Sequence, residues 1–380
     1  MSDTHEPAAL TVVFWGTYDL SKPRTRILRD GLKEAGVQVV EIHADVWSRF
    51  EDKSQMGKLA MALTLLRVLL SYPALIYRYL RAPQHDVVVI PYLGQFDVLV
   101  FWPFARLKRK PVVWDMFLSL YDTVVNDRQM VSKWTPPAMF LYGLEWLGCR
   151  AASRVLLDTK AHAAYISELF SLPSGRADAV PVGAETTVFV RQAPREPHDG
   201  PTRVLFYGQL IPLHGIETIL EAALSERGRA HAWHIIGKGQ QSKLVKDSLA
   251  GANASHIVHD DWVPYDSLIS AIAQTDICLG IFGSSRKAAS VVPNKVYQCL
   301  AAGRTVITRQ SPAMNEVFPA KTAGLMLVPD ADPAALLDAI DAARVAQFPV
   351  MPEDTAGSVQ PRDIGRLLRD RVLVPLTDKI

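Results

Sequence analysis

Two polar side chains, Lys295 and Gln298, stand three residues apart in the stretch VVPNKVYQCLAAGRTVIT. Pro293 and Asn294 suit the start of a short helix, and Gly303 suits its end. Lys295 and Gln298 therefore share one face of the first helical turn. A cation near a helix N-terminus is unfavourable by about 0.3–1 kcal/mol. A bound anion would offset this cost, so the placement favours a ligand-binding lysine over one on a solvated face.

Two glycine-containing turns follow strand-like runs in the same half of the sequence. The run RVLFY leads into GQLIPLHG, and the run AWHII leads into GKGQ. Glycine lets backbone N–H groups approach a ligand closely, and the N-terminus of a following helix attracts anions. One GxG turn is weak evidence, but two in one βαβ series, together with Lys295, predict a ligand that carries phosphate. The candidates in these turns are Gly208, Gln209, His214, Gly215, Gly237, Lys238 and Gly239.

Other candidates lie in the loop GSSRKAASVV and at strand ends of the first half. The loop carries Arg286 and Lys287 just before the Lys295 helix, and the first-half runs TVVFWG and PVVWD end at Gly16 and Asp115. Asp115 could act on a substrate, or it could be a hydrogen-bonded carboxylate at a strand end. Arg24 could contact an acceptor phosphate, or it could stand in a solvated loop. These alternatives stay open on the residues alone.

The elements that must position these residues form a repeating pattern. Nearly unbroken Val, Ile and Leu runs alternate with helical stretches, as is typical of parallel strands covered on both faces. Expected strands are 11–16, 37–42, 86–91, 111–116, 154–159 and 178–183, then 202–208, 232–237, 255–262, 277–282 and 304–308. The βαβ rhythm occurs twice, which predicts an α/β fold of two doubly wound domains. Such sheets bind ligands at the carboxyl ends of their strands, so the natural site is an interdomain cleft.

Proline-rich polar stretches suggest the domain boundaries. We expect a first domain over 1–190, a linker over 191–203, a second domain over 204–350 and a C-terminal segment, 351–380, that returns to the first domain. The linker RQAPREPHDGPTR contains three prolines, one glycine and many charges. That composition is typical of a connecting segment.

Composition excludes several classes of protein. With 380 residues, 49% of them hydrophobic and 21% charged, the chain predicts folded domains rather than disorder. A net charge of +2 without an arginine-rich tract gives no sign of nucleic-acid binding. The three cysteines lie far apart in apolar contexts, typical of reduced thiols in a cytoplasmic protein. The opening MSDTHEPAAL lacks the pattern of a secretory signal. The acidic pair at 260–261 matches no metal-ligand spacing, so no metal site is predicted.

The segment 56–82 is densely apolar but is interrupted by Lys58, Arg67, Pro73 and Arg78. Its uncharged runs are shorter than the roughly 20 residues that cross a bilayer. It could form a helix pair packed on a sheet. It could also form an interfacial helix whose arginines meet anionic lipid headgroups. Both interpretations stay open, so the predicted location is cytoplasmic, with peripheral membrane contact as the alternative.

Several of these motifs together resemble the GT-B glycosyltransferases, specifically the large retaining group called family 4. FYGQLIPLHGIETILEAA resembles the group's GR…KG…L..A signature, WHIIGKGQ its donor turn, and DDWVPYDSLISAIAQTDICL the segment before its donor loop. PNKVYQCLAAGRTVIT resembles its K..E.(M/L)A.G.PVI block, and VPVGAETTVF its interdomain motif. GTYDLSKPRTRILRDGLKEAG resembles the opening of the acceptor domain. The resemblance spans nearly the whole chain and implies the GT-B fold of two Rossmann-like domains.

The chain also departs from the family pattern. The Arg and Lys that grip the nucleotide diphosphate in the family are replaced by Gln209 and His214. The acidic pair of the family falls on Ser290 and Gln298. The amide oxygen of Gln298 can still accept a hydrogen bond, without charge. The family's histidine after the PVV strand is absent, and Asp115 lies nearby.

The resemblance implies sugar transfer from a nucleotide-diphosphate sugar to an acceptor hydroxyl with retention, without metal or cofactor. The acceptor implied is a glycan, a lipid-linked molecule or a small molecule. The catalytic candidates are Asp115, Lys295 and His214. The donor-binding candidates are Gly208, Gln209, Gly237, Lys238, Gly239, Val263, Lys287, Ser290, Asn294 and Gln298, and those on the acceptor side are Gly16 and Arg24. Val263 marks main-chain groups near the base, and Gln298 marks the ribose.

Two other functions fit the same residues. The substitutions at Gln209, His214, Ser290 and Gln298 also suit a non-catalytic partner of another glycosyltransferase whose donor site has degenerated. A nucleotide-sugar epimerase of the same fold is the second alternative. A non-catalytic partner would bind no nucleotide or nucleotide sugar. An epimerase would form an isomer of the nucleotide sugar without any acceptor.

Overall fold

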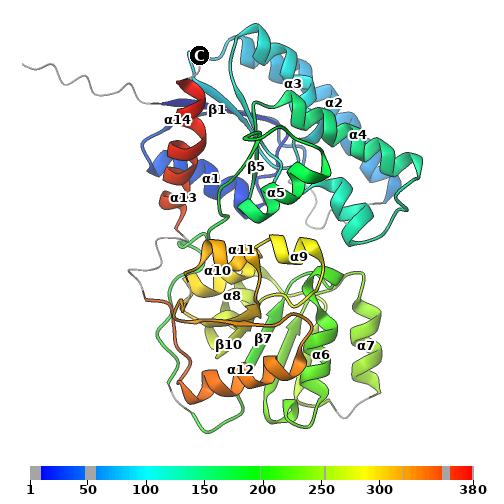
Figure 1. The fold of residues 1–380 in the computed structure, drawn as a ribbon, viewed down its shortest axis with the longest axis vertical. Helices are drawn as coiled ribbons and strands as arrows, with labels where there is room; N and C mark the ends of the chain where they lie inside the picture. Colours follow the sequence, from blue (N-terminus) through cyan, green and yellow to red (C-terminus); the bar gives the residue numbers. More distant parts are fainter. Residues whose placement is uncertain are drawn as a thin grey trace, which may run out of the picture. The chain divides into compact units, whose positions relative to one another are not determined.

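The computed structural model describes residues 10–47, 57–196, 198–251, 254–319, 321–352 and 360–378. The chain divides into two compact units, which are described separately (Figure 1). Unit 1 comprises Met1–Val182 and Pro361–Ile380, and unit 2 comprises Gly183–Gln360. Each unit is built on a six-stranded sheet whose strands all run parallel.

The sheet of unit 1 has the strand order β2-β1-β3-β4-β5-β6. Its strands are β1 Thr11–Gly16, β2 Gln38–His43, β3 Val87–Ile90, β4 Val112–Asp115, β5 Arg154–Leu157 and β6 Ala177–Ala179. Its helices are α1 Pro23–Glu34, α2 Lys58–Leu80, α3 Gln95–Leu107, α4 Pro136–Ala151, α5 Lys160–Leu169, α13 Pro361–Leu368 and α14 Val374–Thr377. A π-helical turn, Asp122–Asp127, precedes α4.

The sheet of unit 2 has the order β12-β11-β10-β7-β8-β9. Its strands are β7 Arg203–Tyr207, β8 Ala232–Ile236, β9 Ile257–Asp260, β10 Ile277–Leu279, β11 Thr305–Arg309 and β12 Leu325–Val328. Its helices are α6 Ile216–Leu224, α7 Ser242–Ala250, α8 Tyr265–Gln274, α9 Arg286–Ser290, α10 Asn294–Ala301, α11 Pro312–Val317 and α12 Pro333–Val345. Two Rossmann-like domains were therefore correctly predicted from the alternation of apolar runs and helical patterns.

The structure corrects two details of the sequence-based prediction. Strand β12 was not predicted, because LMLV is a short edge strand that is only half-buried over most of its length. Within 56–82, the described residues form one helix, α2, rather than a helix pair. Pro73 lies inside α2, where it removes one backbone hydrogen bond without ending the helix.

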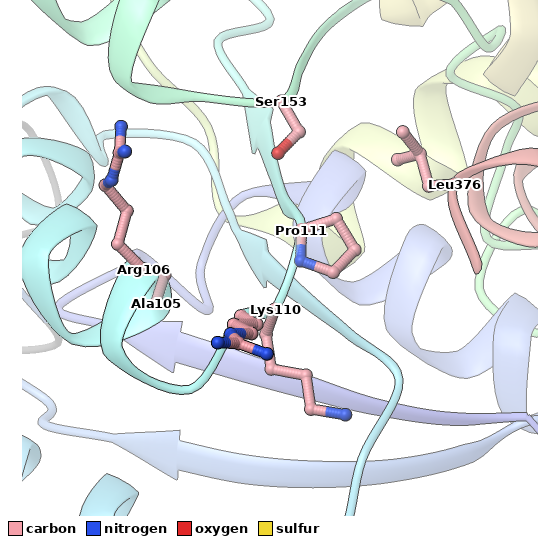
Figure 2. Close-up of a pocket in the computed structure, with 7 residues that line it drawn as sticks. Ala105, Arg106, Lys110, Pro111, Ser153 and Leu376 are labelled. Carbon is pink, nitrogen blue, oxygen red and sulfur yellow. The ribbon is translucent and has the colours of Figure 1, made fainter. Parts of the chain in front are cut away.

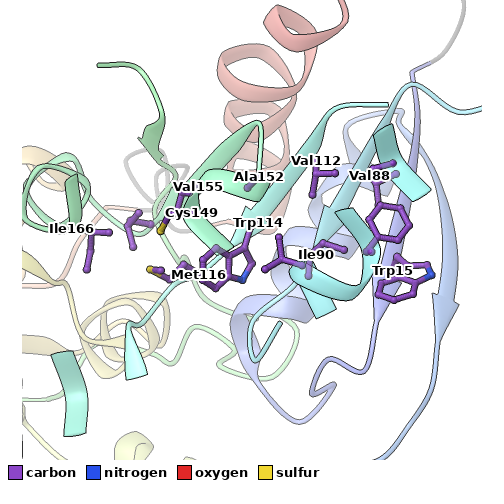
Figure 3. Packing of buried hydrophobic residues seen from close by; sticks show 14 of the residues in the cluster. Trp15, Val88, Ile90, Val112, Trp114, Met116, Cys149, Ala152, Val155 and Ile166 are labelled. Carbon is purple, nitrogen blue, oxygen red and sulfur yellow. The ribbon is translucent and has the colours of Figure 1, made fainter. Parts of the chain in front are cut away.

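The core of unit 1 lies between its sheet and the layer of α2, α3 and α4. Trp15 from β1 and Trp114 from β4 are fully buried in this cluster (Figure 3). Val68 from α2 and Phe101 from α3 belong to the same cluster. The indole N–H of Trp15 donates to the carbonyl of Leu75 in α2 at 3.2 Å. The apolar runs of the strands are continuous because helices cover both faces of the sheet.

The stretch 191–203 lies in unit 2, and the C-terminal helices lie in unit 1. Arg195 and His198 each contact the buried carboxylate of Asp276, at 2.9 and 3.0 Å. Helix α13 packs closely on α1, where Gly31 and Gly365 meet. A Cβ atom on Gly31 would stand 2.1 Å from the carbonyl oxygen of Pro361, and one on Gly365 would stand 2.0 Å from the carbonyl carbon of Gly31. The two glycines thus allow backbone-to-backbone contact.

We expect Gly31→Ala to lower the free energy of unfolding of unit 1 by about 1–3 kcal/mol, since the added methyl group forces the helices apart. The matched control is Gly143→Ala inside α4, where an added Cβ meets nothing within 4 Å. That variant should be neutral or more stable by about 0.5–1 kcal/mol. Urea unfolding monitored by tryptophan fluorescence compares the two. Equal effects of the two substitutions would contradict the close packing of α1 on α13.

Candidate functional site

The carboxyl ends of β7 and β8 are each followed by a glycine with positive φ. Gly208 has φ +143° and Gly237 has φ +153°, conformations that side chains disfavour. A Cβ on Gly237 would stand 1.9 Å from the carbonyl oxygen of Gly208. A Cβ on Gly208 would stand 3.1 Å from the amino nitrogen of Lys295 and 3.0 Å from the ring of His214. The structure therefore brings together four of the residues predicted from sequence: Gly208, Gly237, His214 and Lys295.

Lys295 lies in the first turn of α10, as predicted, but its side chain is buried. Only 6% of the residue is exposed, and its amino nitrogen has no hydrogen-bond partner within the described part of the chain. The amino group lies 3.9 Å from the ring centroid of Phe206, so a cation–π contact is its main compensation. Burial lowers the pKa of Lys295 to about 7. A buried cation without a counter-ion is ready to pair with an anionic ligand.

His214 ends a short 3₁₀ turn, Pro212–His214, that precedes α6. Its Nδ1 donates to the main-chain carbonyl of Gln209, because a carbonyl oxygen only accepts. This bond leaves Nε2 as an acceptor in the neutral ring and as a donor in the protonated ring. The main-chain carbonyl of His214 accepts from the N–H of Phe282 at 3.0 Å. Because both ends of the residue are anchored, the ring is fixed beside Gly208.

Gln298 is held by a residue that the sequence did not single out. The hydroxyl of Tyr207, at the end of β7, donates to Oε1 of Gln298 at 2.8 Å. Burial raises the pKa of Tyr207, so the hydroxyl keeps its proton and acts as the donor. A tyrosine at the last position of a buried strand, followed by glycine, was the signal available in the sequence. Gln298 here uses its amide oxygen within unit 2.

The remaining donor-side candidates lie in α9, in α10, in the loop before α8 and in the turn after β8. Lys287 in α9 is buried, and the hydroxyl of Ser290 donates to the carbonyl of Arg286 at 2.8 Å. Asn294 is half-buried at the start of α10, and Val263 is half-buried in the loop between β9 and α8. The carbonyl of Lys238 accepts from the N–H of Leu210 at 3.1 Å, and Gly239 packs against the same Leu210. This main-chain contact aligns the two glycine turns side by side.

In unit 1, Arg24 and Asp115 bind each other. Both side chains are fully buried, and the shortest distance between them is 2.8 Å. The Arg24 guanidinium also donates to the carbonyls of Val180 and Leu157, at 2.9 and 3.2 Å. Burial raises the pKa of Asp115, while Arg24 acts in the opposite direction. The structure thus shows Asp115 as a hydrogen-bonded carboxylate at a strand end, the alternative that the sequence left open.

Gly16 is positioned by a carboxylate that sequence reasoning missed. Gly16 has φ +132°, and a Cβ there would stand 2.2 Å from Oδ2 of Asp97 in the first turn of α3. Asp97 accepts from the N–H of Thr17 at 2.7 Å and from the hydroxyl of Tyr72 at 2.9 Å. Burial raises the pKa of Asp97 to about 6, against the effect of these hydrogen bonds. An acidic residue in the first turn of a helix after an apolar run was the only local signal.

Two surface hollows lie away from these strand ends. One, of about 370 Å³ in unit 1, is lined by residues that include Arg106, Lys110, Ser153 and Leu376 (Figure 2). The other, of about 470 Å³ in unit 2, includes Arg203 at the start of β7. The first lies next to residues that precede β4 and β5, and the second reaches the start of β7. Among the described residues, no three His, Cys, Asp or Glu side chains gather in a group that could hold a metal ion.

We compared the chain with known protein families and solved structures. Residues 201–343 match the family model described as glycosyl transferases group 1. Sucrose-phosphate synthase from Thermosynechococcus elongatus matches with a TM-score of 0.63 and 15% identity, over 97% of both chains. HepE from Anabaena, solved in complex with UDP, matches with a TM-score of 0.56 and 10% identity, over 97% of this chain and 98% of that one. The fold is GT-B. The predicted resemblance to GT-B glycosyltransferases is thereby confirmed.

A glycosyltransferase from Rickettsia africae also matches the GT-B fold, with a TM-score of 0.53 and 12% identity, over 98% of this chain and 97% of that one. No curated protein matches the sequence. At these identities the structural matches establish the fold. The family-model match covers β7 to α12, the part of the GT-B fold that carries Lys295 and both glycine turns.

We expect Lys295→Met to stabilise unit 2 most at low pH. The pKa of Lys295 falls from 10.5 to about 7 on folding. Between these values the unfolded chain binds the extra proton, so wild-type folding becomes more favourable as pH rises. Methionine removes the cost of burying the charge, and its advantage should shrink as pH rises from about 7 towards about 10.

Urea unfolding across this pH range measures the difference. Lys243→Met on α7 is the control, because the side chain of Lys243 is 87% exposed. Its effect should change little with pH between these limits. A gain from Lys295→Met that is the same at every pH would contradict the buried, unpaired amino group.

Proposed function

We propose that the chain transfers a sugar from a nucleotide-diphosphate sugar to an acceptor hydroxyl, with retention of anomeric configuration. The observation that carries the proposal is the buried amino group of Lys295, which has no partner within the described residues and faces the glycine turn at Gly208. It lies in the domain that matches glycosyl transferases group 1. HepE, which shares the fold, was solved with UDP and with UDP-glucose, which supports a uridine nucleotide as the first donor to test.

In this mechanism the diphosphate is the leaving group. The bond between the anomeric carbon and the phosphate oxygen breaks, and a bond from the acceptor oxygen to the same carbon forms. The proton of the acceptor hydroxyl passes to the departing phosphate. Lys295 in its protonated form pairs with the charge that develops on the phosphate, and backbone N–H groups of the glycine turns add hydrogen bonds. His214 contributes a hydrogen bond through Nε2, or a positive charge when it is protonated.

Binding of the donor is coupled to the protonation of Lys295. Because burial lowers its pKa to about 7, part of the empty enzyme carries a neutral amine at neutral pH. A diphosphate favours the ammonium form and raises this pKa. Because Gln209 and His214 replace the family's Arg and Lys, this proposal relies on Lys295 and Lys287 for positive charge. Gln298, held by Tyr207, then offers the ribose its amide N–H groups.

The first-unit candidates have a supporting role. The catalytic assignment of Asp115 and the acceptor contact of Arg24 stay predictions from sequence. Their buried ion pair supports a role in which they fix the ends of β4, β5 and β6 under the acceptor side of unit 1. Gly16 belongs to the same side through its packing on Asp97. A glycan or lipid-linked acceptor completes the proposal.

We expect isothermal titration to detect UDP binding that Lys295→Met weakens by at least about tenfold, since the variant loses a charge-assisted contact. Lys243→Met should bind like the wild type. Proton uptake on binding, measured as a dependence of the binding heat on the buffer, should be present in the wild type and absent in Lys295→Met. Failure of UDP, GDP and their sugars to bind would favour the non-catalytic partner instead.

Turnover separates the remaining alternatives. A glycosyltransferase should release UDP from UDP-glucose in proportion to glycoside formed, and proton NMR of the product should show the anomeric configuration of the donor. An epimerase would convert the nucleotide sugar into an isomer without any acceptor. Inversion at the anomeric carbon would overturn the retaining mechanism while leaving sugar transfer intact.

A further inference from the structure

The outer surface of α2, α3 and α4 in unit 1 is unusually apolar. Most of the exposed large hydrophobic side chains in the described part of the chain lie between Leu59 and Leu147. In α2, Leu59, Leu63, Leu66 and Leu70 follow each other at helical spacing with exposed fractions of 74, 48, 50 and 69%. A surface helix normally presents polar side chains at these positions. The face thus consists of helix positions whose apolar side chains are not covered by the described part of the chain.

The three helices form one continuous layer. Val68 of α2, Phe101 of α3 and Cys149 of α4 all belong to the same buried cluster on one face of the sheet. Helix α3 packs between α2 and α4, and Figure 1 shows the three side by side. Their outward side chains therefore point away from the same sheet face. We call this outward surface, together with the loop 128–135 that leads into α4, the α2–α4 face.

The loop and α4 add a second group of exposed apolar side chains. Trp134 is 83% exposed, and Met139 and Phe140 at the start of α4 are 62 and 59% exposed. Lys133 stands 5.8 Å from the ring centroid of Trp134, and Arg106 of α3 stands 5.4 Å from the ring of Trp102. Aromatic rings next to cations are typical of protein surfaces at the boundary between lipid and water.

The exposed charged side chains in the described part of α2, α3, α4 and the loop 128–135 are cations. Arg67, Arg106 and Lys133 are exposed. The carboxylates between residues 57 and 151 are buried, apart from the half-buried Asp86: Asp97, Asp115, Asp122, Asp127 and Glu145. Two copies of this face would bring like charges together, which opposes a symmetric dimer. An anionic surface with an apolar interior complements both the cations and the leucines.

We propose that the α2–α4 face binds an anionic lipid bilayer, with the α2 leucines and the Trp134–Phe140 segment inserting together between the headgroups. The described residues include no helix long and apolar enough to cross a membrane, so the contact is peripheral. The leucines supply burial in the acyl boundary, and each cation adds about 1 kcal/mol near an anionic surface. If the proposed function holds, this contact brings a lipid-linked acceptor to unit 1.

Co-sedimentation with vesicles tests the proposal on the full chain. The wild type should sediment with vesicles that contain phosphatidylglycerol and phosphatidylcholine, and much less with phosphatidylcholine alone. High salt should release it in part, because screening weakens the attraction between cations and headgroups. Recovery of the wild type in the supernatant with both vesicles at low salt would overturn the proposal.

Variants of exposed residues locate the contact. Leu66→Gln with Leu70→Gln should lower binding about tenfold or more, and Trp134→Ser should lower it severalfold. Arg67→Gln with Lys133→Gln should lower binding to anionic vesicles by about 25-fold, at roughly fivefold for each cation. Val345→Ser in α12 and Lys243→Gln in α7, both exposed in unit 2, are the matched controls and should bind like the wild type.

Two outcomes would contradict the arrangement. If Trp134→Ser binds like the wild type while Leu66→Gln with Leu70→Gln does not, the segment around Trp134 takes no part in binding. In that case α2 alone contacts the bilayer. If sedimentation velocity shows a dimer that Leu66→Gln with Leu70→Gln converts to a monomer, and vesicles bind nothing, the face joins two copies instead. Titration with UDP is independent of these variants, so loss of vesicle binding with intact UDP binding separates this proposal from the proposed function.

Discussion

The packing of Gly237 against the carbonyl of Gly208 is the constraint on which the candidate site depends. This contact leaves no room for a side chain on Gly237, so the turns after β7 and β8 run directly against each other. The ring of His214 and the amino group of Lys295 lie where a side chain on Gly208 would begin. The amino group of Lys295 thereby lies over the ring of Phe206, without a hydrogen-bond partner among the described residues. The site is pre-organised for an anion because the backbone itself creates the place where the cation lies.

Both units bury charged side chains near the carboxyl ends of their strands, but they differ in how these charges are paired. In unit 2, the amino group of Lys295 is buried without a hydrogen-bond partner among the described residues, and this arrangement is stable only at a cost that a ligand can relieve. In unit 1, the charged side chains at the strand ends are paired internally, as Arg24 with Asp115, or hydrogen-bonded, as Asp97 with Thr17 and Tyr72. Paired buried charges hold loops in place, whereas an unpaired one attracts a counter-ion. This difference explains why unit 2 carries the stronger case for binding a diphosphate.

The distribution of charge in unit 1 also links its interior to its surface. Nearly all carboxylates between 57 and 151 are used inside the unit, where Glu145, for example, accepts from the N–H of Leu120 and the side chain of Ser119. The cations of the same region remain on the outer surface of the helices. Because the acids are committed to holding loops, the outer layer of α2, α3 and α4 acquires a positive charge beside its exposed leucines. The positive charge of this surface thus follows from the use of the carboxylates as hydrogen-bond acceptors inside the unit.

The sequence by itself determined the two parallel α/β domains and the glycine turns, because unbroken apolar strands and glycines after them are local patterns. It also identified Lys295 and Gln298 as neighbours on one helical turn, since their spacing fixes that relation. Only the tertiary structure decided that Lys295 is buried beside Gly208, that Tyr207 holds Gln298, and that Arg24 binds Asp115. These contacts join residues up to 91 positions apart, and their partners are set by how strands align in a sheet. No local pattern encodes that alignment, so burial and pairing of charges could not be read from the sequence.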